Sequence, residues 1–158
     1  MSNQQNTFMA EAIRLATENI SSGLGGPFGA VVVKNGEIIA RGANKVICDN
    51  DPTAHAEVVA IREACKALNS FQLDDCEIYC SCEPCPMCLG AIYWARPARI
   101  FFAAGRYDAA DAGFDDHFIY KEIGTELNER KIPTNQILRN EAIEVFRVWK
   151  ESDIKIPY

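Results

Sequence analysis

The sequence feature that most constrains this chain is Pro84-Cys85-Pro86-Met87-Cys88, together with His55-Ala56-Glu57 earlier in the sequence. Pro86 suits the first position of a helix, because proline needs no amide hydrogen there and its φ is already helical. Cys85 then lies at the mouth of the helix and Cys88 one turn later, so both sulfur atoms can converge on one point. The orphan amides and the helix dipole at that end favour thiolates over thiols.

His55 adds an imidazole to the two thiolates, which makes three protein ligands for one metal ion. Zinc prefers such nitrogen and sulfur donors, and three protein ligands leave a fourth position for water, as in catalytic sites. Glu57 points into the apolar arc of the next predicted helix, where a carboxylate is costly unless it has a partner or a task. Proton transfer from an activated water is such a task. The arc consists of Val58, Ile61, Ala64, Cys65 and Leu68.

Each half of this pattern has an ordinary explanation when it stands alone. Pro-Cys-x-x-Cys also occurs in redox pairs and in halves of structural zinc knuckles, and His-x-Glu pairs are common by chance. A non-catalytic structural zinc module needs a fourth protein ligand, for which Cys82 is the candidate at close sequence range. The two motifs together, each at a helix start, favour a catalytic zinc site.

The composition fits one globular domain, since 48% of the 158 residues are hydrophobic. A formal net charge of −6 and a pI of about 4.9 argue against a nucleic-acid phosphate backbone as the main substrate surface. No apolar run approaches the length of a membrane span, and no export signal precedes the first helix. We therefore expect a cytoplasmic enzyme with no nucleic-acid or membrane partner.

The seven cysteines favour a reducing compartment with a metal site over a disulfide framework, because their number is odd. Cys65 belongs to the apolar arc described above. Cys76, Cys80 and Cys82 share strand parity with Ile78, which predicts buried packing for each of them.

The first half of the chain predicts a helix followed by a hairpin. Apolar residues recur every four positions and end at Ser21-Ser22-Gly23, which predicts an amphipathic helix. The glycine-rich segment 25–29 is interpreted as backbone approaching a pocket. Asn35-Gly36 predicts a type I′ turn between strands at 30–33 and 37–40. The apolar residues of the helix are Phe8, Ala12, Ala16 and Ile20.

The second half alternates strand and helix around the metal motif. Strands at 77–82 and 99–104 flank a helix at 87–95, which implies a right-handed parallel crossover. Ligands collect outside the carboxyl ends of such strands, where the motif cysteines lie. Further on, we predict a helical region at 108–123, a linker at 124–131, a fifth strand at 133–138 and a last helix at 140–151. The apolar face of that helix consists of Ala142, Val145, Phe146 and Trp149.

Four further polar residues, taken from the sequence alone, have ordinary interpretations. Asn44 ends the hairpin, and spacing alone favours a turn residue over an amide that faces the metal pocket. Asp115 and Asp116 form a pair that is usually solvated or capping. His117 follows them without a metal-ligand partner at useful spacing.

With these motifs in place, the chain resembles the bacterial guanine deaminases of the cytidine-deaminase superfamily, whose zinc signature is His-x-Glu with Pro-Cys-x-x-Cys. The resemblance runs nearly end to end. It is carried by segments 25–30, 50–57, 81–96 and 112–116. The metal motifs belong to the whole superfamily, whereas Gly-Phe-Asp-Asp at 113–116 and the closing Tyr158 are narrower and point to guanine.

The resemblance implies an α/β fold of three layers, α/β/α, with a mixed five-stranded central sheet flanked by helices. It also implies that residues 1–158 form a single deaminase domain and that the protein is a homodimer. The C-terminal segment, about 125–158, would be exchanged between subunits, so that Tyr158 closes the neighbouring pocket.

Carried over residue by residue, the resemblance implies one Zn²⁺ per subunit and a proton shuttle at Glu57. It reverses the interpretations of Asn44 and Asp116, which become substrate contacts. His117 departs from the family pattern, where a small polar residue is expected. The implied zinc ligands are His55, Cys85 and Cys88, and the implied substrate-binding residues are Phe28, Asn44, Ala56, Trp94, Asp116 and Tyr158.

The implied reaction is hydrolytic deamination of guanine to xanthine and ammonia, a step of purine metabolism. Guanosine, an ammeline-like aminotriazine, cytosine and the wobble adenosine of tRNA are alternative substrates. The tRNA alternative is disfavoured by the acidic charge and the missing basic tail. The alternative from another class is the non-catalytic structural zinc module.

Overall fold

The computed structural model describes residues 3–158 and divides the chain into two compact units, Met1–Asp116 and His117–Tyr158. The first unit contains a four-stranded sheet in the order β2-β1-β3-β4. Its strands are β1 (Gly29–Lys34), β2 (Glu37–Ala43), β3 (Cys76–Cys82) and β4 (Arg99–Ala104). The α/β class is confirmed, and the prediction of five strands is wrong.

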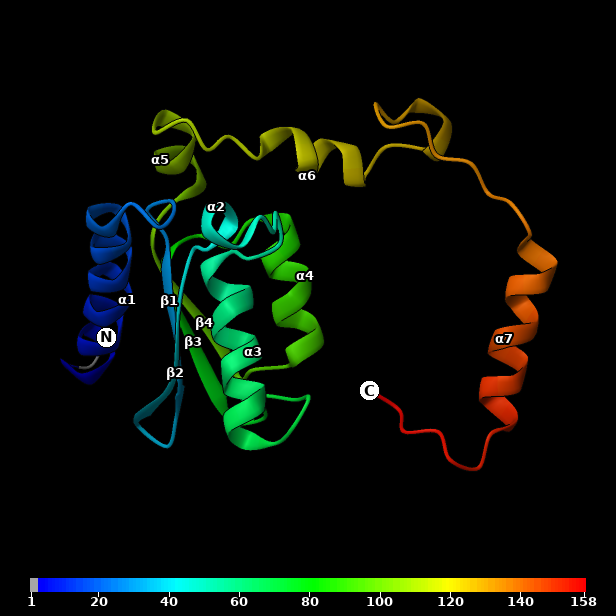
Figure 1. Cartoon of the computed structure of the whole chain (residues 1–158), viewed down its shortest axis with the longest axis horizontal. Helices are drawn as coiled ribbons and strands as arrows, with labels where there is room; N and C mark the ends of the chain where they lie inside the picture. Colours follow the sequence, from blue (N-terminus) through cyan, green and yellow to red (C-terminus); the bar gives the residue numbers. More distant parts are fainter. Residues whose placement is uncertain (1–2) are drawn as a thin grey trace. The chain divides into compact units, whose positions relative to one another are not determined.

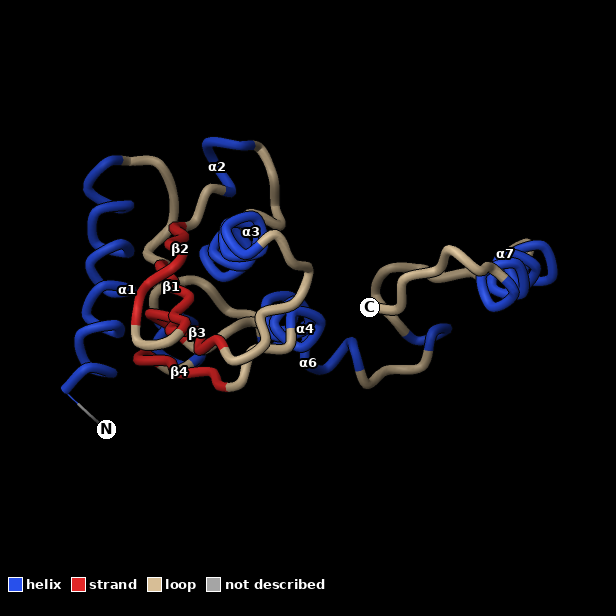
Figure 2. The backbone as a smooth tube through the Cα atoms, turned by 90° about the horizontal axis from the view of Figure 1, so that it is seen from below, coloured by secondary structure: helices blue, strands red, loops and turns tan. Residues whose placement is uncertain are grey.

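Helices cover both faces of this sheet, as Figures 1 and 2 show. Helix α1 (Asn3–Ser22) lies on one face, and α3 (Ala56–Leu68) and α4 (Pro86–Ala95) lie on the other. Two short helices, α2 (Val46–Asp49) and α5 (Arg106–Asp111), stand in the loops at the end of the sheet where α3 and α4 begin. Helix α2 falls in a stretch for which the sequence predicted only a loop.

The hairpin and the parallel crossover are both confirmed. Asn35 and Gly36 have φ values of 52° and 79°, as a type I′ turn requires, and β1 pairs with β2 antiparallel. β3 pairs with β4 parallel, so α4 is the crossover helix. The metal motif therefore lies between the carboxyl end of β3 and the amino end of α4.

The core has two layers because successive strand residues point to opposite faces. Ala30 and Val32 of β1 join a cluster with α3 and α4, whereas Val31 and Val33 join Phe8 of α1 and Tyr79. The Tyr79 ring is stacked on Phe101 with centroids 4.6 Å apart. Cys76 and Cys80 are buried as predicted, while Cys65 and Cys82 are only half-buried.

The predicted buried face of helix α1 is wrong at its last position, by one residue. Phe8, Ala12 and Ala16 are buried as expected, but Ile20 is 57% exposed. The position that continues the stripe is Asn19, only 6% exposed. A buried amide is tolerated there because main-chain carbonyls accept its hydrogens.

The second unit contains α6 (His117–Ile123), a 3₁₀ turn (Leu127–Glu129) and α7 (Arg139–Glu151), and no strand. The predicted fifth strand at 133–138 is irregular backbone. A strand needs a neighbour for its main-chain hydrogen bonds, and the described part of this unit offers none.

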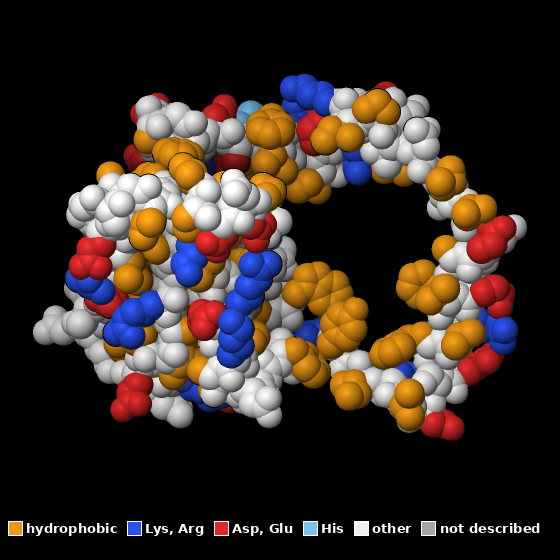
Figure 3. All heavy atoms as spheres, viewed as in Figure 1, with side chains coloured by type: hydrophobic (Ala, Val, Ile, Leu, Met, Phe, Trp, Pro, Cys, Tyr) orange, Lys and Arg blue, Asp and Glu red, His pale blue; other side chains and the backbone are white. Residues whose placement is uncertain are grey.

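Helix α7 has the predicted amphipathic pattern, but its apolar face is not buried. Its hydrophobic side chains lie on one side and its charged ones on the other (Figure 3), and Val145, Phe146 and Trp149 are all exposed.

A search of the described residues, 3–158, finds no helix with the length and apolar character of a membrane span.

Candidate active site

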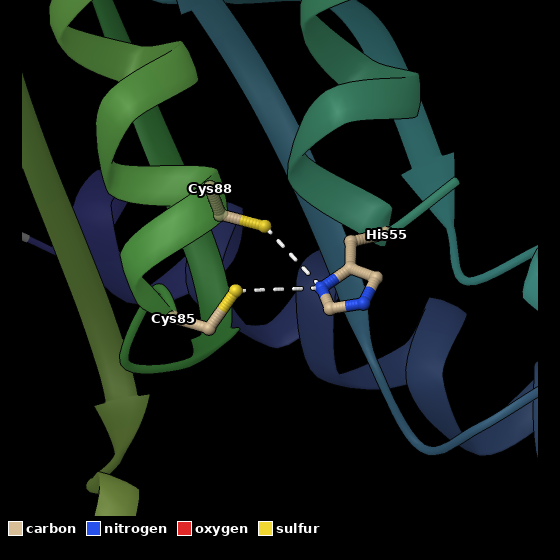
Figure 4. Close-up of side chains that lie close together, drawn as sticks. All are labelled: His55, Cys85 and Cys88. Carbon is tan, nitrogen blue, oxygen red and sulfur yellow. Dashed lines mark hydrogen bonds between the residues drawn. The ribbon is translucent and has the colours of Figure 1, made fainter. Parts of the chain in front are cut away.

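The first turns of α3 and α4 bring the motif residues together. His55 is the N-cap of α3, and Cys85 is the N-cap of α4, both with extended backbone. Pro86 opens α4, as its fixed φ predicts, and Cys88 lies in the same first turn. The side chains of His55, Cys85 and Cys88 point toward one another (Figure 4).

The spacing of these three side chains fits a zinc ion. His55 Nδ1 lies 3.5 Å from Cys85 Sγ and 3.4 Å from Cys88 Sγ, and all three ligand atoms lie within 4.8 Å of one another. Tetrahedral zinc with ordinary Zn–N and Zn–S bonds separates a nitrogen and a sulfur ligand by about 3.6 Å. The cluster can therefore hold one metal ion with little movement.

The two thiols differ sharply in acidity. The hydrogen bond with Cys88 lowers the pKa of Cys85 to about 4, with a further contribution from His55. The pKa of Cys88 is raised by its hydrogen bond with Cys85 and by burial. The hydrogen bond to Cys85 raises the pKa of His55. A metal that binds here displaces the remaining thiol proton, since the ligand is the thiolate.

Glu57 lies in the first turn of α3, two positions after His55, and is 8% exposed. Its inward orientation is confirmed. Burial raises the pKa of this carboxyl group, and the nearby Cys85 adds to the effect. A buried carboxyl group beside a metal cluster is the arrangement that proton transfer needs.

Asn44 makes the turn contact that its spacing predicts, and its role as a substrate contact stays a prediction. Its Oδ1 accepts from the Val46 amide, 3.3 Å away, which is the Asx-turn contact. The same oxygen accepts from the main-chain N–H of Gly26. The main-chain N–H of Asn44 donates to the Phe28 carbonyl at 3.1 Å. Among the described residues, none accepts a hydrogen bond from Asn44 Nδ2, so its N–H groups are available to a ligand.

Three further residues were predicted as substrate contacts. The Phe28 ring meets the edge of Phe114 with centroids 5.0 Å apart. Asp116 is half-buried, and its pKa is raised by burial and by the negative charge of Cys85. Ala56 is buried in the first turn of α3. Asp116 and Ala56 thus lie near the metal cluster, and the roles of all three residues stay predictions.

Among the described residues, the metal-ligand cluster includes none of the other candidates. Trp94 is 64% exposed and stands two turns beyond Cys88 on α4. Tyr158 belongs to the second unit and is exposed there. Cys82 Sγ faces the Gly105 carbonyl, 3.8 Å away, and within residues 3–158 the metal-ligand cluster does not include it.

Sequence reasoning missed two residues that shape the site. Asn19 reaches the Asn44 carbonyl from α1, and its signal was a polar residue within an apolar stripe. Gly42 lets the first turn of α3 approach β2, because a Cβ there would lie 2.1 Å from the Ala56 carbonyl oxygen. A glycine inside a strand is the corresponding signal.

A family profile described as the cytidine and deoxycytidylate deaminase zinc-binding region matches residues 2–104. The chain belongs to this family. The profile ends at the last residue of β4, so it includes every residue of the metal cluster and Glu57. The family's zinc-binding character agrees with the donor set found here.

Relatives within the family fall into two groups. The chain is 59% identical to a guanine deaminase of Bacillus subtilis over 96% of its own length and 97% of that protein. The solved structure of guanine deaminase from Bacillus subtilis matches with a TM-score of 0.95 at 57% identity, over 100% of this chain and 99% of that one. A tRNA-specific adenosine deaminase of Aquifex aeolicus is 49% identical, but over only 49% of this chain and 52% of that protein.

Proposed function

We propose that this protein is a zinc-dependent guanine deaminase, which hydrolyses guanine to xanthine and ammonia. The observation that carries the proposal is the extent of the similarity. The match to the Bacillus subtilis guanine deaminase spans 96% of the chain, far beyond the family region that ends at residue 104. The match to the Aquifex aeolicus tRNA deaminase covers only about half of the chain.

The metal centre and Glu57 would perform the chemistry. His55, Cys85 and Cys88 would hold the ion, and bound zinc would supply a water of lowered pKa near neutral pH. As water adds to C2 of guanine, the Glu57 carboxylate would accept one proton and donate it to N3. Glu57 would then accept the second proton from the new C2 hydroxyl group and donate it to the amine, which leaves as ammonia while C2 becomes the carbonyl carbon of xanthine.

The neighbouring side chains would select the base. Phe28 and Trp94 wall the purine, Ala56 contacts it, and Asn44, Asp116 and Tyr158 hydrogen-bond its edges. An ionised Asp116 would accept from the N–H groups that distinguish guanine from cytosine. Sites built for such polar partners reject analogues without them by as much as about 10⁴–10⁵.

The direct test is release of ammonia and xanthine from guanine by the zinc-loaded protein, beside a Glu57→Gln variant. Glutamine has nearly the same shape but cannot carry the proton, so we expect full zinc content and almost no turnover. Zinc retained with guanine untouched in the unsubstituted protein would refute the guanine assignment. Guanosine, aminotriazines and cytosine would then be assayed in turn.

Guanosine is the alternative substrate that is hardest to distinguish from guanine, because it carries the same base. A pocket that is open at one edge could also accept its ribose. If Tyr158 closes that edge, the free base is favoured. Comparing guanine with guanosine before and after deletion of Tyr158 distinguishes the two substrates. A gain of guanosine turnover on deletion supports the closing role of Tyr158.

We further propose that the protein is a homodimer in which the segment 125–158 is exchanged between subunits. Helix α7 supports this, because an amphipathic helix of 13 residues is marginal in water unless its apolar face is covered. In the first unit, Ile100 and Phe102 of β4 are also exposed. Apolar surfaces of this kind mark interfaces.

Complementation tests the exchange. A Glu57→Gln chain and a chain lacking Tyr158 are coexpressed, so that mixed dimers form. If Tyr158 serves the partner's pocket, the mixed dimer has one complete site, and the preparation recovers about one quarter of full activity. If each chain closes its own pocket, no site is complete and activity stays at the level of the separate variants.

A further inference from the structure

Asn19 connects α1 to the loops that carry the predicted substrate contacts. It is buried, and both of its Nδ2 hydrogens are used. One is donated to the Gly26 carbonyl at 2.8 Å, and the other to the Asn44 carbonyl at 2.9 Å. One side chain on a rigid helix thus ties together two loop segments that are far apart in sequence.

The segments at Gly26 and Asn44 are also hydrogen-bonded to each other, so that Asn19, Gly26 and Asn44 are connected pairwise. The Gly26 amide donates to Asn44 Oδ1, so Gly26 contacts both Asn19 and Asn44. The Gly25 main chain packs tightly against Asn44 and Asn19, because a Cβ at Gly25 would lie 2.2 Å from the Asn44 carbonyl oxygen and 2.9 Å from Asn19 Nδ2. Asn19 is therefore one of the contacts that hold the Asn44 main chain in place.

The orientation of the Asn44 side chain follows from this arrangement. Its Oδ1 already accepts from two main-chain amides, those of Gly26 and Val46. The amide group can satisfy both contacts only with Nδ2 turned the other way. Asn44 thus presents donors to a ligand, and a shift of its main chain would move those donors.

We propose that Asn19 is a positioning residue for recognition of the base. It helps to fix the main chain at Asn44 and Gly26, and through them the donor group of Asn44. This inference rests on the proposed function, in which Asn44 hydrogen-bonds guanine. The ligand chemistry it serves is a hydrogen-bond acceptor on the edge of a purine base.

A purely structural Asn19 would behave differently in kinetics. If it only stabilises the fold, its loss reduces the number of folded molecules and lowers the apparent kcat, while KM is unchanged. If it positions Asn44, its loss weakens ground-state and transition-state binding together, which raises KM and leaves kcat unchanged. The division between KM and kcat therefore separates the two roles.

The experiment uses the zinc-loaded full chain with the variants Asn19→Ala and Asn19→Asp. Aspartate keeps the volume but has no hydrogens for the two carbonyls. We expect each variant to retain zinc and to raise KM for guanine by about 3–10-fold, the worth of one neutral hydrogen bond. Ser21→Ala is the matched control, because the Ser21 hydroxyl donates to the Thr17 carbonyl within α1, and the kinetics of this variant should be unchanged.

A double-mutant cycle completes the test. When Asn44→Ala is already present, adding Asn19→Ala should not raise KM further, because the group that it positions is gone. An unchanged KM in the Asn19 variants, or the same rise with and without Asn44, overturns the inference while the guanine deaminase assignment stands. Absence of guanine turnover in the unsubstituted zinc-loaded protein overturns the assignment, and the inference with it.

Discussion

Gly42 offers a sharp test of how the metal site is positioned. It lies in β2 opposite the first turn of α3, and a Cβ there would meet the Ala56 carbonyl oxygen at 2.1 Å and the Ala60 amide nitrogen at 2.6 Å. Both contacts are with helix backbone, which cannot rotate aside as a side chain can. The substitution Gly42→Ala must therefore displace the start of α3, where His55 and Glu57 stand.

The size of the displacement follows from these contacts. Restoring an acceptable separation from Ala56 requires a retreat of about 1 Å. Overpacking of this kind costs about 1–3 kcal/mol of unfolding free energy. A 1 Å misplacement of catalytic groups costs about 10²-fold in rate, and a disturbed ligand shell weakens metal binding by about 10–100-fold.

Gly29→Ala is the matched control. A Cβ at Gly29 would lie 2.2 Å from the Ala12 carbonyl oxygen, so the clash is nearly equal, but it pushes on α1 on the other face of the sheet. Both variants should lose similar stability in urea unfolding. Only Gly42→Ala should lose zinc to a competing chromophoric chelator at lower chelator concentration than the unsubstituted protein.

Two outcomes would contradict this dependence of the metal site on Gly42. Equal zinc affinity in the two glycine variants would show that the site does not depend on the approach of α3 to β2. Full stability and full zinc affinity in Gly42→Ala would show that the strand and helix separate without cost. Because Gly29 adjoins Phe28, KM for guanine is not a suitable readout for this comparison, and zinc affinity decides it.

Three further predictions concern single side chains. Arg14 and Arg41 lower the pKa of Glu11 from 4.5 to about 2, so their ion pairs stabilise the fold above pH 4.5 and lose this effect as the pH falls toward 2. Glu11→Gln should lower the free energy of unfolding, measured with urea at pH 7, by about 1 kcal/mol. The difference in unfolding free energy between the variant and the unsubstituted protein should become smaller below pH 4.5, and a difference that does not change with pH would contradict this. Cys82→Ser should keep its zinc by elemental analysis, whereas loss of the metal would make Cys82 a fourth ligand. Asp116→Ala should keep zinc and lose guanine turnover, and retained turnover would remove Asp116 from base selection.

Features fixed by local chemistry were predictable from the sequence. Asn35 and Gly36 are residue types that adopt positive φ, so the hairpin follows from two positions. The convergence of the two cysteine ligands was equally predictable, because Pro86 marks a helix start and the spacing of Cys85 and Cys88 matches one helical turn. In each case the physical cause lies within a few residues of its effect.

Features that depend on distant partners were not predictable in the same way. The segment 133–138 has a composition that a strand could use, but nothing in it shows whether a sheet edge is available. The choice between Asn19 and Ile20 as the buried residue of α1 depends on carbonyls at Gly26 and Asn44. The spacing of apolar residues predicts the helix, but it contains no information on these distant carbonyl acceptors.

The two glycines also explain why small residues on the helices matter for the site. Gly29 faces Ala12 and Ala16 of α1, and Gly42 faces Ala56 and Ala60 of α3. Hydrophobic burial alone would hold these helices at the distance set by larger side chains, and it gives little directional control. Backbone-to-backbone contact fixes the separation more tightly, because neither side has rotatable atoms to absorb a change. The precision of the metal site therefore depends on Gly42, which contributes little apolar area and binds no metal.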